Sequence, residues 1–207
     1  MSGAVRAARA KKKWKYIAGA LSVLVLIFVS NAYDPERALQ ICGVAVDRGV
    51  HADYAFSFEV AVPQGETVRS TVIRVEADSL TRAIERADLM SARPLQLNHG
   101  ILLVIGDTAV TDIEALSEMY LKQWRGARET FMAVCEGSAA DILDGEQSEN
   151  LRSTGLGEQL AAAQNKLGFV RAEKFADRCV SGEMLPLPMI TQNGAGYSIT
   201  GTYYCEM

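Results

Sequence analysis

The chain has 207 residues, 49% of them apolar, which suits one globular domain of ordinary size preceded by a targeting segment. This apolar content argues against a wholly disordered chain, because enough side chains are present to form a core. Six Lys and Arg side chains and no acid lie within residues 1–15; of the 21 basic side chains this leaves 15, against 25 acidic ones, for the rest. The acidic remainder argues against a nucleic-acid partner, which would need a surplus of cations.

An uncharged segment, Tyr16–Val29, follows this basic cluster. A positive region and then an apolar stretch are typical of an export signal, and the small residues Ser30 and Ala32 predict cleavage between Ala32 and Tyr33. If the segment is retained, it anchors the chain in a membrane with the basic cluster in the cytoplasm. The residues expected to form the anchor, with Trp14 and Tyr16 at the lipid interface, are Trp14, Tyr16, Ile17, Leu21, Val23, Leu24, Val25, Leu26, Ile27, Phe28 and Val29.

Both alternatives place residues 33–207 on the extracytoplasmic side. Six adjacent cations argue against a third interpretation, a buried core helix.

In an exported chain the four cysteines can form disulfides. Cys42 and Cys135 lie in apolar runs, however, and are predicted to be buried thiols. A Cys179–Cys205 disulfide is compatible with export, but no spacing rule supports it.

The first half of the body reads as strands followed by a helix. Residues 39–46 predict a buried strand, and Asp47-Arg48-Gly49 a turn. Residues 54–62 alternate strictly, with the aromatic and Val side chains on one face and Ala55, Ser57, Glu59 and Ala61 on the other, which predicts a strand with one solvated face. Residues 70–76 predict a third strand. A helix begins at Leu80 with Asp78 or Ser79 as its N-cap and ends before Pro94.

The second half alternates strands and helices. Short apolar runs at 101–105 and 130–135 predict buried strands. Thr111 and Glu114 predict a capping box for a helix whose apolar face carries Ile113, Leu116, Tyr120 and Trp124. The remaining expected elements are a short helix from Ser138 to Leu143, two helices over 156–167 and 172–179, an extended segment at 185–188 and a strand over 197–205.

This order predicts an α+β fold, a mixed sheet with helices packed on it, preceded by one hydrophobic helix. The polar stretch 144–150 is the best candidate for a flexible joint. We therefore expect three parts: the signal or anchor over 1–32, a mixed β/α part over 33–145, and a helical part with a terminal strand over 146–207. The helices within 138–183 either cover the sheet or form a docking surface for a partner protein, and the sequence does not separate these two roles.

The sequence predicts no catalytic, cofactor-binding or metal-binding residue. His51 follows a turn and is expected in solvent, and His99 has no further ligand at close spacing. The Gly155-Leu156-Gly157 pattern lacks a preceding strand and a third glycine, so we interpret it as part of a helix start and not as a dinucleotide loop. The two classes considered are therefore a non-enzymatic subunit and, as the alternative, an extracytoplasmic enzyme or ligand-binding module.

Five stretches taken in order resemble the N-terminal domain of the Ger(x)C family, the C subunits of nutrient germinant receptors of spore-forming bacteria. They are YDPERALQICGVAVDRG from Tyr33, FSFEVAVPQG from Phe56, SLTRAIERADLMSARPLQLNHGILLVIGDTAV from Ser79, RETFMAVCEGSAADILDGE from Arg128 and MLPLPMIT from Met184. The resemblance implies a non-enzymatic subunit without cofactors that assembles with polytopic A-type and B-type subunits. It also implies a place on the outer face of the spore inner membrane and a role in nutrient-triggered germination.

Two departures from the family pattern bear on the membrane segment and on length. Family members usually carry an acylated cysteine just before the aromatic-Asp pair, and here Ala32 precedes Tyr33 and Asp34. Anchoring by acylation is therefore not expected, which favours a retained signal-anchor. The family also continues into a C-terminal domain where this chain ends after Cys205, so we expect either a short variant or a fragment.

Overall fold

A computed structural model describes residues 38–97, 100–123, 129–144, 151–169, 171–179, 184–193 and 196–205. The predicted N-terminal helix, the anchor residues between Trp14 and Val29, the Ala32–Tyr33 cleavage site, His99 and Trp124 lie outside these ranges. Residues 39–207 group as one compact unit. Among the described residues, no helix has both the length and the hydropathy that crossing a membrane requires.

The described strands form one eight-stranded sheet, and its parallel and antiparallel pairs confirm the predicted mixed sheet. Its path is β3-β2-β1-β5-β6-β7-β8, with β4 paired to β1. Strands β1, β5, β6 and β7 run parallel to one another, whereas β2, β3 and β8 are antiparallel to their neighbours. The strands are β1 Leu39–Arg48, β2 Tyr54–Gln64, β3 Thr67–Ala77, β4 Leu95–Gln96, β5 Leu102–Gly106, β6 Phe131–Cys135, β7 Leu185–Asn193 and β8 Gly196–Cys205.

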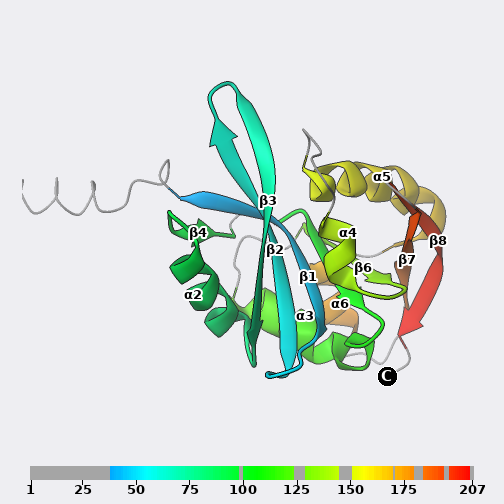
Figure 1. Cartoon of the computed structure of the whole chain (residues 1–207). Helices are drawn as coiled ribbons and strands as arrows, with labels where there is room; N and C mark the ends of the chain where they lie inside the picture. The colour runs from blue at the N-terminus through cyan, green and yellow to red at the C-terminus, as the bar shows by residue number, and fades with distance from the viewer. Residues whose placement is uncertain are drawn as a thin grey trace, which may run out of the picture. The chain divides into compact units, whose positions relative to one another are not determined.

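Helices cover both faces of this sheet (Figure 1). They are α2 Leu80–Met90, α3 Ile113–Gln123, α4 Ala139–Leu143, α5 Arg152–Leu167 and α6 Ala172–Cys179, with a 3-10 turn η2 at Val110–Asp112. Alternate side chains of β5 and β6 enter opposite cores, as a period of two requires: Leu103 and Met132 pack with α2, α3 and α6, and Val104 and Ala133 with α4 and α5. We call these the apolar face and the capped face; the second name refers to the carboxylates described below.

The structure corrects the predicted solvated face of β2. Tyr54, Phe56, Phe58 and Val60 enter the apolar core as expected, but Ser57 and Glu59 on the other side are also buried. Helices α4 and α5 cover this second side, which the alternation of the strand could not reveal.

Two capping predictions have different outcomes. Ser79 caps α2 as predicted, because its Oγ accepts from the Arg82 N–H at 3.4 Å. The capping box at Thr111 is wrong: Thr111 lies inside η2, and its hydroxyl donates to Asp112 Oδ1.

The end of the chain forms more sheet than predicted. Residues 185–193 make a full strand, β7, which pairs with β6 on one side and β8 on the other. Cys42, Cys135 and Cys205 are buried free thiols, which confirms the prediction for the first two. The Cys179–Cys205 disulfide is absent, because Cys205 is free.

Candidate functional site

The first feature of the capped face is a buried carboxylate in the middle of β2. The Glu59 side chain is 0% exposed. Its Oε1 accepts from the Arg152 N–H at 2.6 Å and the Ser70 hydroxyl at 2.9 Å, and its Oε2 accepts from the Ser153 N–H at 2.8 Å. A carboxylate at a helix N-terminus satisfies free N–H groups and complements the helix dipole. Glu59 therefore fixes the start of α5 on the sheet.

A glycine in the neighbouring strand makes room for this contact. A Cβ on Gly43 of β1 would lie 2.9 Å from the Ser153 Cβ and 3.4 Å from Glu59 Oε2. The register of β1 against β2 shifts between Ile41 and Gly43, so a β-bulge lies at the same place. The close approach of α5 to the sheet thus depends on a strand position without a side chain.

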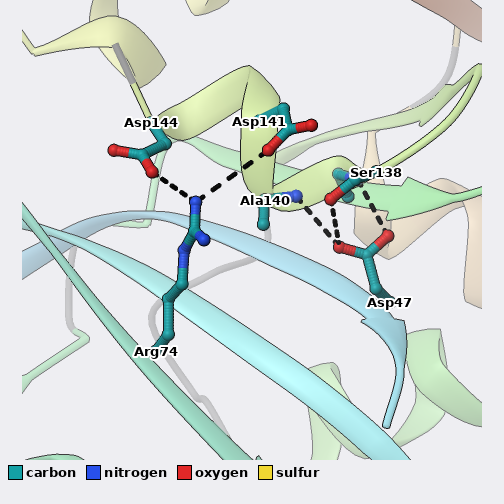
Figure 2. A network of polar contacts seen from close by, with 7 residues as sticks. Asp47, Arg74, Ser138, Ala140, Asp141 and Asp144 are labelled. Carbon is teal, nitrogen blue, oxygen red and sulfur yellow. Dashed lines mark hydrogen bonds and ion pairs between the residues drawn. The ribbon is translucent and has the colours of Figure 1, made fainter. Parts of the chain in front are cut away.

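A second carboxylate acts in the same way on α4. Asp47, at the end of β1, accepts from the Ala140 N–H at 3.0 Å and the Ser138 hydroxyl at 3.1 Å, as Figure 2 shows. It also accepts from the Ala139 N–H at 2.8 Å. Ser138 is the N-cap of α4, but its side chain makes no cap bond to the helix. The predicted serine cap is therefore replaced by an aspartate 91 residues earlier in the sequence.

An ion-pair cluster lies at the other end of α4. The Arg74 guanidinium of β3 pairs with Asp144, and its Nη2 lies 3.9 Å from Asp141 Oδ1 (Figure 2). These side chains are about half exposed, so solvent weakens the attraction between them. The cluster nevertheless joins an outer strand to the same short helix that Asp47 caps.

Glycines also bring α5 close to its neighbours, which confirms that the Gly-x-Gly pattern belongs to a helix. A Cβ on Gly157 would lie 2.5 Å from Ile101 Cγ2, and one on Gly155 would lie 2.9 Å from the Tyr197 hydroxyl. That hydroxyl donates to the Arg152 carbonyl at 3.2 Å. Helix α5 thus contacts the β7–β8 hairpin through its first turns.

Two buried thiols lie near the capping carboxylates Glu59 and Asp47. Burial, then the nearby Glu59 carboxylate, raises the pKa of the Cys42 thiol to about 11. Burial, then the Asp47 carboxylate, raises the pKa of Cys135 to about 12. Neither thiol is therefore a thiolate nucleophile at neutral pH. Within the described ranges, no cluster of His, Cys, Asp and Glu has the arrangement of a metal site, and His51 is exposed as predicted.

Sequence reasoning missed both capping carboxylates. Each bonds to a helix more than 90 residues away in the sequence, and no local pattern encodes that pairing. A weak signal existed for Glu59, since a charge in the middle of an otherwise apolar strand requires a partner when it is buried. The helices within 138–183 do cover the sheet, and their contact with a partner protein stays a prediction.

Comparison with known proteins bears on what this fold does. The family model described as the spore germination protein N-terminal domain matches residues 32–179, more than two thirds of the chain. The chain belongs to this family. The matched region includes Asp47, Glu59 and the helices that they cap.

One solved structure, described as the crystal structure of the GerBC protein, is similar to the chain at 13% identity with a TM-score of 0.38. The similarity covers 79% of this chain and 48% of that one, so the chain spans about half of its length. No curated protein matches the chain.

Proposed function

We propose that this spore germination protein domain is a non-enzymatic, membrane-retained subunit of a germinant receptor-like complex. It takes part in nutrient-triggered germination on the extracytoplasmic face of the spore inner membrane. Its partners are polytopic A-type and B-type receptor subunits. The observation that carries the proposal is the family match over residues 32–179.

Retention in the membrane is supported by the sequence in front of the matched region. Tyr16–Val29 is uncharged, six cations precede it, and Ala32 occupies the place where the family usually has an acylated cysteine. An uncleaved helix with its cations in the cytoplasm would hold the domain more firmly than one acyl chain. Retention therefore supplies the anchor that acylation cannot.

The described part of the chain suits a role as a rigid binding partner. Its carboxylates at Asp47 and Glu59 are engaged by backbone donors, and its thiols at Cys42 and Cys135 are buried. The side of α5 that faces solvent carries Glu158, Gln159, Ala161 and Ala162. The small Ala161 and Ala162 side chains leave the backbone of this helix open to close approach by another protein. We assign partner contact to this helical surface.

Co-purification tests the complex. The chain, tagged at its C-terminus, is purified from detergent-solubilised spore membranes, and its companions are identified by mass spectrometry. We expect polytopic receptor subunits in amounts comparable to the tagged chain. Recovery of the chain alone would overturn the proposal. A variant with Glu158→Arg and Ala162→Arg on the exposed side of α5 is expected to fold normally and to recover less of the partners.

A melting experiment separates this role from a ligand-binding module. A ligand that binds only the folded state raises the melting temperature by mass action. The purified chain is heated with and without a panel of amino acids and sugars. We expect an unchanged melting temperature, since nutrient recognition is assigned to the assembled complex. A reproducible rise with one nutrient would show that the chain alone is a binding module.

A further inference from the structure

Two large apolar side chains on the last turn of α2 are exposed to solvent. Leu89 is 87% exposed and Met90 is 65% exposed. The other side of the helix packs Leu80, Ala83 and Ala87 into the apolar face, so Leu89 and Met90 are not needed for that core. Arg93 follows them and is also exposed. Leu89, Met90 and Arg93 together are called the α2 tip below.

The α2 tip lies where the chain enters the sheet. The Leu39 N–H donates to the Pro94 carbonyl at 2.9 Å, and β4, which follows the tip, pairs with the first residues of β1. Figure 1 shows the end of α2, β4 and the start of β1 side by side. The tip is therefore adjacent to Leu39, the first residue of the sheet.

The length of the preceding chain limits how far this entry point lies from the apolar segment. Nine residues separate Val29 from Leu39, and such a stretch spans at most about 35 Å. Strand β1 then runs ten residues, about 33 Å, to the opposite end of the sheet, which Val50 follows. A domain held by residues 16–29 therefore keeps the α2 tip within reach of the bilayer.

We infer that the α2 tip docks on the lipid surface of the membrane that holds the chain. The inference rests on the membrane retention proposed above. Leu89 and Met90 would enter the boundary between headgroups and acyl chains, and Arg93 would face anionic headgroups. Two apolar side chains are too few for a stable protein interface, which buries at least about 1,200 Å². They are sufficient for a tethered domain, because the tether makes the contact intramolecular.

Fluorescence quenching by brominated lipid tests this contact on the full chain. Leu89→Trp is reconstituted into vesicles of phosphatidylcholine and phosphatidylglycerol, with and without bromine on the acyl chains. The matched control is Val50→Trp, because Val50 is 82% exposed and follows the other end of β1. Trp14 and Trp124 contribute the same background to the parent and to both variants. Flotation of the vesicles shows whether the chain is bound.

The account predicts that all three proteins float with the vesicles, and that bromine quenches Leu89→Trp beyond the parent. Val50→Trp is expected to match the parent. Flotation without additional quenching of Leu89→Trp overturns the docking inference and leaves membrane retention standing. Equal quenching at both positions also overturns it, because the contact would not be specific to the α2 tip. A chain that fails to float overturns membrane retention and the inference together.

Discussion

The two faces of the sheet hold their helices in different ways. On the apolar face, α2, α3 and α6 pack through large buried side chains such as Phe56, Tyr120 and Phe175. On the capped face the core has fewer buried residues, and the strands provide carboxylates that bond to the first N–H groups of α4 and α5.

This difference follows from what each face has to hold. Helix α4 has five residues, and a helix that short does not form without tertiary contacts. Apolar contacts are not directional, so they allow a helix to shift along the sheet. A carboxylate that accepts two N–H bonds instead fixes the residue at which a helix begins. The carboxylates of the capped face therefore determine where α4 and α5 begin. Packing on the apolar face supplies most of the free energy of folding. The predictions below separate these two contributions.

The largest effect is expected from removing an aromatic ring of the apolar face. Phe175→Ala leaves a cavity where a fully buried side chain stood, and the free energy of unfolding should fall by about 4 kcal/mol. Urea denaturation of the full chain measures the change. Leu167→Ala, at a half-exposed position, is the matched control and should change it by less than about 0.5 kcal/mol. A loss below about 1 kcal/mol for Phe175→Ala would show that this face does not dominate.

Glu59→Gln is expected to come next, at about 2–3 kcal/mol, because the amide cannot accept from all three donors and leaves buried polar groups unpaired. The substitution keeps the shape of the side chain, so no cavity confuses the result. Hydrogen exchange should accelerate most in the first turn of α5, and exchange in α2 should accelerate no more than the global loss of stability requires. Glu158→Gln on the exposed side of α5 is the control. Uniform acceleration across both helices would contradict a local capping role.

Asp47→Asn should lower stability by about 1 kcal/mol, because the amide offers one acceptor oxygen where the carboxylate uses two and so leaves an N–H of α4 unpaired. Hydrogen exchange should accelerate more in α4 than in α2, α3, α5 or α6. Ser138→Ala removes only the hydroxyl bond to Asp47 and is expected to cost less. If Ser138→Ala costs as much as Asp47→Asn, the serine is the true cap and the assignment is wrong.

The smallest effect is expected at the ion pairs of α4 with β3. Arg74→Ala should cost less than about 1 kcal/mol, because the charges are half exposed. The difference between parent and variant should vanish in 1 M NaCl, where the screening length falls to about 3 Å. A salt-independent loss would mean that the packing of the Arg74 side chain, and not its charge, matters.

The strands and helices were largely predictable, because each has a strong local pattern. The strict alternation of β2 and the short apolar runs at β5 and β6 placed three strands correctly. Residues 185–193 were predicted only in part, as an extended segment at 185–188. Pro186 and Pro188 lack an N–H, which argues against a strand that pairs on both sides, yet β7 pairs with both β6 and β8. Local patterns report which residues can form an element, and they do not report which elements become neighbours.

The same limit explains two errors, one on each face of the sheet. Glu59 was assigned to solvent because its neighbours Ser57 and Ala61 are small or polar, and the covering helix comes more than 90 residues later. Thr111 and Glu114 have the spacing of a capping box, but the chain forms a 3-10 turn over that threonine. Tertiary contacts decided the burial of Glu59, and such contacts cannot be obtained from spacing alone.

The mass of the intact chain recovered from spore membranes tests the central proposal most directly. Membranes are washed with alkaline carbonate, the tagged chain is extracted in detergent, and its mass is measured without digestion. The account predicts a chain that stays with the membrane and retains residues 1–32. A chain that begins at Tyr33 and leaves with the wash would contradict membrane retention, and with it the proposed place of this domain in a receptor complex.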